Sequence, residues 1–208
     1  MTNYTLTELI EYRKKLESSL IADSKEIFYN DSFLHAILVH TALLKKAQKT
    51  EDKRVEMFCG SFSIFRDQTA EKVEAYKNSV IPMDDQQQNL ISQWYEFNPY
   101  EDLISELETF WKAGGKLLLI VENDITSIKD EMVWKRILPY YKQGQFIISN
   151  FGHSLGINHF VVTGNSYRRE KSDDQKKAFC CFNDPETSEI LRDNFKGIYQ
   201  LSKSLSVA

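Results

Sequence analysis

The chain has 208 residues, of which 42% are hydrophobic and 12% are aromatic. This composition is sufficient for a buried core and excludes a low-complexity protein. The formal net charge of −4 excludes a surface that is basic throughout, so binding of an anion or a nucleic acid requires a local positive patch. We expect a single domain over residues 1–208, with an N-terminal helix over about 1–24 as an appendage.

Hydrophobic periodicity and turn residues divide the chain into alternating helices and strands. In chain order, the predicted elements are a helix at 5–21, a strand at 26–30, a helix at 31–49, a strand at 53–66, helices at 67–80 and 98–115, a strand at 116–124, a helix at 131–144, strands at 145–150, 158–164, 166–170 and 177–182, and a helix at 185–205. This order predicts an α/β fold with a mixed β-sheet of six or seven strands flanked by helices. The residues expected in the buried faces of the sheet are Ile120, Ile147, Val161 and Phe179.

Several helix boundaries carry recognisable signals. Thr5 and Glu8 have the spacing of a capping box at the start of the first helix. Asp31 is expected to cap the second helix, and Pro139 is expected to break the helix at 131–144. Asp184 followed by a proline predicts an N-cap and a first helical position.

Gly60 stands alone within the strand predicted at 53–66. An isolated glycine there indicates a bend or bulge, or a strand end at which another group approaches the backbone. Glu122 and Asp124 follow a buried strand, on the side where sites form in an α/β sheet, although acids at strand ends also cap helices. These strand ends are therefore candidate positions for a site.

Sequence motifs exclude several classes of function. The chain has no P-loop, no dinucleotide-binding glycine motif and no nucleophile-elbow motif. Cys59, Cys180 and Cys181 form neither a disulfide framework nor a zinc spacing, so no metal and no cofactor are expected. The longest apolar run, 117–121, is too short to cross a bilayer, and the N-terminus lacks the apolar stretch of a signal peptide. We expect a cytoplasmic protein without a membrane partner.

The segment from 157 to 186 contains a histidine, His159, at the start of a predicted strand. Two further short strands and a helix that contains Phe195 follow it. This order of parts resembles the C-terminal half of phospholipase D-like domains, and the similarity extends over about 25–205. In that superfamily the histidine begins a His-x-Lys-x-x-x-x-Asp motif and attacks a phosphodiester, so the resemblance implies that His159 is the catalytic nucleophile.

The motif is incomplete in this chain. The lysine position holds Val161 and the aspartate position holds Ser166. Arg168 and Arg169 are the candidate replacements for the lysine as phosphate-binding groups. Because side chains alternate along a strand, the two arginines should face opposite sides of the sheet, and at most one can serve. Ordinary structural roles remain open: His159 as a strand histidine that is hydrogen-bonded to a neighbour, and Arg168 as a solvated strand residue paired with Glu170 or Asp173.

Two functions follow from the resemblance. The first is a divergent phospholipase D-like protein that acts on a phosphodiester, in nucleic acid, through a site centred on His159. The second is a catalytically inactive module that binds a protein or nucleic-acid partner in a bacterial multi-protein system. The family's site needs two histidine motifs and this chain offers one, so an active site would require a homodimer.

Overall fold

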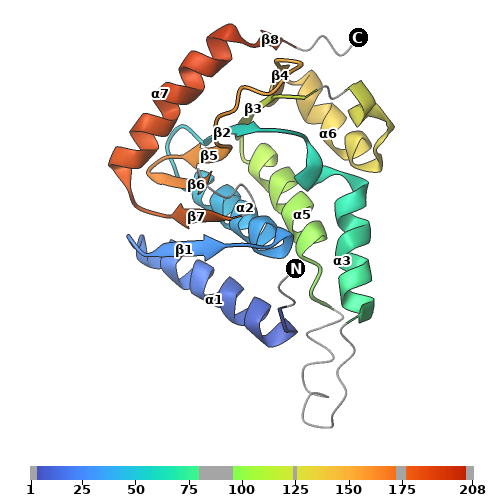
Figure 1. The fold of residues 1–208 in the computed structure, drawn as a ribbon, viewed down its shortest axis with the longest axis vertical. Coiled ribbons are helices and arrows are strands. Elements are labelled where there is room, and N and C mark those ends of the chain that lie inside the picture. The colour runs from blue at the N-terminus through green and yellow to red at the C-terminus, as the bar shows by residue number, and fades with distance from the viewer. Residues whose placement is uncertain (1–3, 80–95, 124–125, 172–176, 205–208) are drawn as a thin grey trace.

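The computed structural model describes residues 4–79, 96–123, 126–171 and 177–204 (Figure 1). Within them the α-helices are α1 (Leu6–Ala22), α2 (Phe33–Ala47), α3 (Asp67–Ser79), α5 (Pro99–Lys112), α6 (Met132–Lys142) and α7 (Pro185–Leu201). The strands are β1 (Ile27–Asn30), β2 (Arg54–Cys59), β3 (Lys116–Val121), β4 (Phe146–Asn150), β5 (Phe160–Thr163), β6 (Ser166–Glu170), β7 (Ala178–Cys181) and β8 (Lys203–Ser204). Two short 3₁₀ helices are η1 (Ser63–Phe65) and η3 (Thr126–Asp130).

The strands form one mixed sheet in the order β1-β7-β6-β5-β2-β3-β4-β8. β2, β3 and β4 are parallel, and the remaining neighbours are antiparallel. The predicted α/β class with a mixed sheet flanked by helices is thereby confirmed. The sheet has eight strands where six or seven were expected, because the two-residue β8 pairs with β4 in a segment that was assigned to the last helix.

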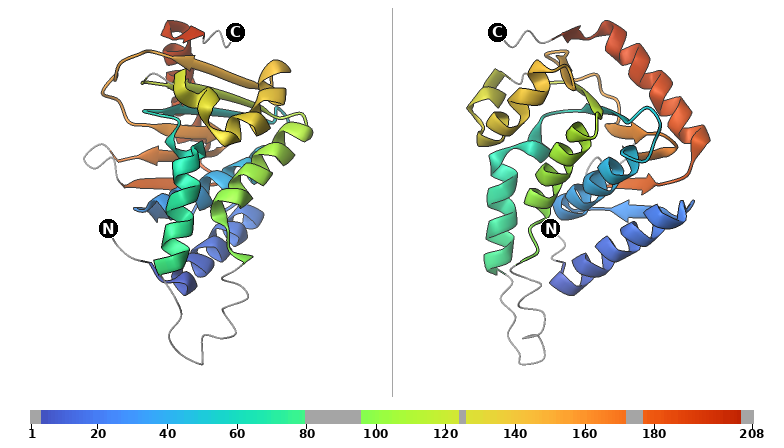
Figure 2. Two further views of the ribbon diagram at one scale, coloured as in Figure 1. Left: turned by 90° about the vertical axis from the view of Figure 1, so that its right-hand side faces the viewer. Right: turned by 180° about the vertical axis from the view of Figure 1, so that it is seen from behind.

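Helices cover both faces of the sheet. Figure 1 shows α7 on one side and α2, α3 and α5 on the other, and the two further views in Figure 2 agree. The core accordingly has two parts, because neighbouring residues of one strand point to opposite faces. Met57 packs in the cluster that contains buried residues of α2 and α5, whereas Phe58 packs in the cluster that contains buried residues of α7.

Burial of the four residues that were expected inside is uneven. Ile120 and Val161 are 0% and 3% exposed. Ile147 and Phe179 are half-buried and pack at the margin of the cluster under α7. The first helix, α1, which the sequence analysis treats as an appendage, contributes the buried Leu9 to the same cluster as α2.

Local sequence signals set most helix ends. Thr5 and Glu8 form the predicted capping box. Two expectations are wrong. Ser32, and not Asp31, is the N-cap of α2, because its hydroxyl accepts the hydrogen bond of the His35 backbone N–H. Pro139 does not break α6, because it lies near the end of that helix, where the Gln143 N–H still bonds the Pro139 carbonyl at 3.2 Å.

Asp184 caps α7 as predicted and also holds the sheet. Its carboxylate accepts hydrogen bonds from the Thr187 backbone N–H at 3.1 Å and from the Tyr167 hydroxyl of β6 at 3.2 Å. Asp184→Ala should lower the free energy of unfolding by about 1–2 kcal/mol, because an orphan helix N–H loses its partner. Asp184→Asn, which keeps an acceptor oxygen, should lower it by less. Urea unfolding of both variants tests this, and equal losses would contradict the capping role.

Candidate functional site

The carboxyl ends of three strands and the start of a fourth meet at one edge of the sheet. β2 and β3 are paired up to Cys59 and Val121, and β5 runs antiparallel to β2. His159 directly precedes β5, and its carbonyl accepts the Glu170 backbone N–H at 2.9 Å at the end of β6. His159, Glu170 and the strand-end Glu122 therefore come together from positions that are far apart in the sequence.

Both nitrogens of the His159 imidazole face carboxylates. Nδ1 lies 2.8 Å from an oxygen of Glu170, and Nε2 lies 3.2 Å from an oxygen of Glu122. The side chains are 13% and 5% exposed for the two glutamates and 19% for His159. Burial by itself lowers the pKa of His159, but the contacts and charges of Glu170 and then Glu122 outweigh it and raise the pKa above 6.5. The arrangement favours an imidazolium ion.

Glu122 is itself held in place. Its carboxylate accepts the Leu155 backbone N–H at 2.6 Å and the Ser154 hydroxyl at 3.0 Å. Burial raises its pKa, yet these hydrogen bonds and the His159 contact together lower it. The carboxylate is thus ionised and oriented, and it lies against Nε2 of His159. From the sequence, Glu122 is identified only as a strand-end acid. Asp124, the second acid named with it, lies outside the described residues.

Gly60 makes this arrangement sterically feasible. β2 ends at Cys59, and a Cβ built at Gly60 would lie 2.9 Å from Cε1 of His159. A side chain at this position would displace the imidazole. Of the two interpretations of Gly60, the close approach of another group to a strand end is therefore the one that the structure supports.

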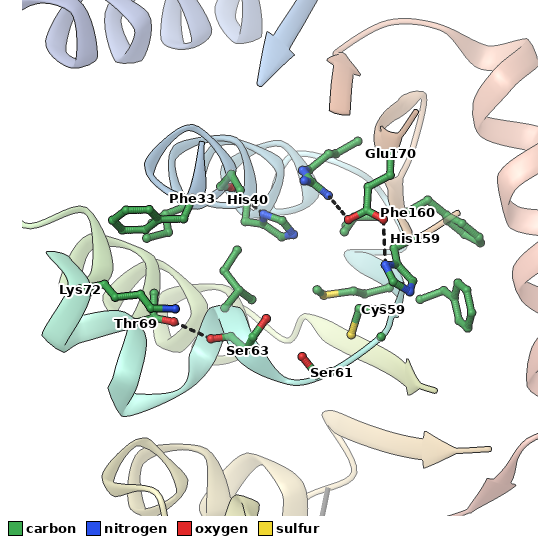
Figure 3. Close-up of a pocket in the computed structure, with 18 residues that line it drawn as sticks. Phe33, His40, Cys59, Ser61, Ser63, Thr69, Lys72, His159, Phe160 and Glu170 are labelled. Carbon is green, nitrogen blue, oxygen red and sulfur yellow. Dashed lines mark hydrogen bonds and ion pairs between the residues drawn. The ribbon is translucent and has the colours of Figure 1, made fainter. Parts of the chain in front are cut away.

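A cavity of about 340 Å³ lies beside His159, between the sheet, α2 and α3 (Figure 3). Besides His40 of α2, three basic side chains line it: His159 directly before β5, Arg168 of β6 and Lys72 of α3. The Arg168 guanidinium is largely buried, donates from Nε to the Asn30 side chain at 3.1 Å and has its Nη1 3.9 Å from Glu170. Burial lowers the pKa of Arg168, but the guanidinium remains cationic at neutral pH because its ordinary value is so high.

The cavity contains two further groups with nucleophilic potential. His40 donates from Nδ1 to the Ala36 carbonyl at 2.6 Å, and burial together with the Arg168 charge lowers its pKa to about 3. Burial and the two nearby glutamates raise the pKa of Cys59 to about 12. His40 is therefore a neutral ring and Cys59 a protonated thiol, and neither resembles an activated nucleophile.

The predicted phosphate-binding arginines are separated, as alternation required. Val161 pairs with Arg168 and Phe160 with Arg169 in the antiparallel β5–β6 ladder. Arg168 shares the cavity with His159, whereas Arg169 lines a different cavity under α7. Lys72 was not singled out from the sequence, because nothing in the pattern of α3 distinguishes it from a solvated helix lysine.

The two motif positions that depart from the phospholipase D pattern have structural roles. Val161 is 3% exposed and belongs to the core. Ser166 is fully buried and donates from its hydroxyl to the Phe182 carbonyl at 2.7 Å. Among the described residues, no group of three or more His, Cys, Asp and Glu side chains has the arrangement of a metal site. Within the same residues, every helix is too short or too polar to span a membrane.

No protein-family model matches the sequence, and no curated protein matches it either. The fold is similar to that of an archaeal chromatin protein. This protein, TrmBL2, whose structure shows a novel mode of DNA binding, aligns with a TM-score of 0.53 and 12% identity over 96% of this chain. The chain spans 65% of the length of TrmBL2. At this identity the similarity concerns the fold alone.

A second solved structure is a more distant match. Nuc, a phospholipase D family member from Salmonella typhimurium, aligns with a TM-score of 0.43 and 10% identity over 86% of this chain and 96% of Nuc. The α/β fold class is thus established by the structure, while the phospholipase D-like assignment stays a prediction.

The steric role of Gly60 can be tested with a pair of alanine variants. Gly60→Ala should lower the free energy of unfolding by about 1–3 kcal/mol, because the new Cβ overlaps the His159 ring. The control is Gly197→Ala in α7, where a Cβ meets nothing within 4 Å and the change should stabilise by about 0.5–1 kcal/mol. Equal effects of the two variants in thermal or urea unfolding would contradict the close approach.

The raised pKa of His159 predicts a pH dependence of stability. A group whose pKa is higher in the folded state stabilises fully below its unfolded value, here about 6.5, and the stabilisation is lost as the pH rises through the folded value. The wild type should therefore lose more free energy of unfolding between about pH 6 and pH 9 than His159→Gln does. The exposed His153→Gln serves as the control and should follow the wild type. Parallel pH profiles for all three proteins would show that the two carboxylates do not hold an imidazolium.

Proposed function

We propose that the chain is a phospholipase D-like module, with residues 1–208 forming one domain, that binds a phosphodiester of nucleic acid and does not cleave it. The observation that supports this best is the imidazole of His159 held between Glu122 and Glu170. The two carboxylates compensate the charge of the imidazolium, so an anionic ligand would be held by Arg168 and Lys72 of the same cavity. With both nitrogens paired to carboxylates, the His159 ring offers no lone pair for attack on phosphorus.

The charges around the cavity support an anionic ligand. Arg168, Lys72 and His159 line it together with the carboxylate of Glu170, and the Glu122 carboxylate contacts His159 beside it, so the positive charges exceed the negative ones by one. Arg168 presents a guanidinium from the floor, which suits bidentate contact with phosphate oxygens. Lys72 is exposed on α3 and has no ion-pair partner among the described residues, so it is free to meet a second phosphate at the mouth. This is the local positive patch that a chain of net charge −4 requires.

Nucleic acid is the phosphodiester that we favour. Backbone phosphates supply most of the affinity in protein–nucleic acid complexes, and lysine and arginine are the usual contacts. The fold is one that a DNA-binding chromatin protein also uses. A repeating phosphate chain could engage Lys72 and Arg168 together.

The competing function is cleavage through His159. The specific observation in its favour is that Glu170 contacts Nδ1 and so orients the ring toward the cavity edge. Such a mechanism requires Glu122 to leave Nε2, and it requires a second His159 from another copy of the chain in a homodimer. In that mechanism one His159 attacks the phosphorus, and the imidazolium of the second His159 protonates the leaving group. One ring cannot perform both steps, because the attacking ring is bonded to the phosphorus.

The proposal is tested with a fluorescein-labelled 20-nucleotide DNA, single-stranded and duplex, by fluorescence anisotropy at two salt concentrations. Lys72→Gln and Arg168→Gln should each weaken binding by about tenfold or more, because a charge-assisted contact to phosphate is lost. Lys14→Gln, an exposed lysine of α1, removes the same charge elsewhere and should leave binding unchanged. Lys72 is at the surface, so its variant remains informative if Arg168→Gln fails to fold.

The same samples, incubated with and without a chelator, should leave both DNAs intact on a denaturing gel. Cleavage that disappears in His159→Ala would overturn the non-cleaving function, and light scattering would then be expected to show a dimer. Absence of binding by the wild type, or equal binding by Lys72→Gln and Lys14→Gln, would overturn the nucleic-acid function itself.

A further inference from the structure

A second cavity lies on the opposite face of the sheet from His159. Its volume is about 570 Å³, and it is open to solvent and bordered by α7, by β5 and β6, and by the segment before β5. Most of the lining is apolar and includes Phe151, Leu155, Phe160, Leu191 and Ile198. Figure 1 shows α7 flanking these strands on the side away from α2 and α5. A cavity of this size and character suits a small organic ligand.

Arg169 is the cation of this cavity. It lines the cavity from β6, and its guanidinium carbon lies 5.5 Å from the centre of the Phe179 ring. Its Nε is shielded from solvent and has no hydrogen-bond partner, so a ligand in the cavity would meet the guanidinium through its terminal nitrogens. Among the described residues Arg169 forms no ion pair. A half-buried guanidinium that lines an apolar cavity without an ion-pair partner is a suitable binding group for an anion.

The remaining polar groups of the lining do not supply that anion. Asp193 borders the cavity, but its carboxylate pairs with Lys196 at 2.9 Å, and both side chains are more than 60% exposed. Asn158 and Asn194 are neutral. The cavity therefore combines one unpaired positive charge with an apolar wall, and this combination selects a ligand that has a single anionic head and an apolar body.

We propose that this cavity binds a small amphiphilic carboxylate. The carboxylate would bond the Arg169 guanidinium in the two-pronged geometry that this pair favours. The hydrocarbon part would pack against Leu155, Leu191 and Ile198. The site is independent of the proposed phosphodiester function, because Arg168 and Arg169 face opposite sides of the sheet.

Decanoate is the probe, and isothermal titration calorimetry of the full chain measures its binding. Arg169→Gln should weaken decanoate binding about tenfold or more through loss of the charged partner. Gly197→Leu should weaken it similarly, because Gly197 lines the cavity and has open space where a side chain would begin. Decanol, which has the same chain without the charge, should bind at least about tenfold more weakly than decanoate.

The control is Lys14→Gln, which lies on α1 and should bind decanoate as the wild type does. Arg169→Gln should retain wild-type DNA binding, which separates this site from the one that contains His159. No decanoate binding by the wild type, equal binding of decanol, or unchanged binding in both Arg169→Gln and Gly197→Leu would overturn the proposal. Gly197→Leu keeps the test decisive if Arg169→Gln is unstable.

Discussion

The structure depends on a central sheet that is buried on both faces. Strands such as β3 are apolar at nearly every position, because odd and even residues pack into different clusters, one under α2 and α5 and the other under α7. Burial of this apolar surface is the main stabilising contribution to the fold. The polar groups of the two cavities lie at strand ends, as Glu122 and His159 do, or within β6, as Arg168 and Arg169 do.

The protonation state of His159 depends on the carboxylates that surround it at the edge of the sheet. A strand-start histidine with one carboxylate partner is an oriented base, because the other nitrogen keeps its lone pair. The addition of Glu122 on the second nitrogen changes that state, since each carboxylate stabilises the protonated ring more than the neutral one. The hydrogen bonds from Leu155 and Ser154 keep Glu122 in place. In this structure the strand-end Glu122 thus favours the protonated state of His159.

The two arginines of β6 illustrate the same dependence on position. Although they are neighbours in sequence, they differ in their contacts. Arg168 donates a hydrogen bond to Asn30 and lies near Glu170. Arg169 lies over the ring of Phe179 and has no ion-pair partner among the described residues. A guanidinium that is already satisfied by the protein holds its geometry and can position a ligand. Arg169 lacks such an anchor, and the two cavities are therefore proposed to bind ligands of different shape.

The sequence by itself determined which elements follow one another along the chain, the α/β class and most of the helix caps. Hydrophobic periodicity and capping residues act over only a few positions, so they can be recognised locally. The sequence also determined that Arg168 and Arg169 face opposite sides, since alternation is a property of any strand. Only the tertiary structure decided that Glu122 and Glu170 enclose His159, that Gly60 makes room for it, and that Lys72 reaches the same cavity. These contacts join residues that are up to about a hundred positions apart, and they depend on strand order and register, which no local pattern encodes.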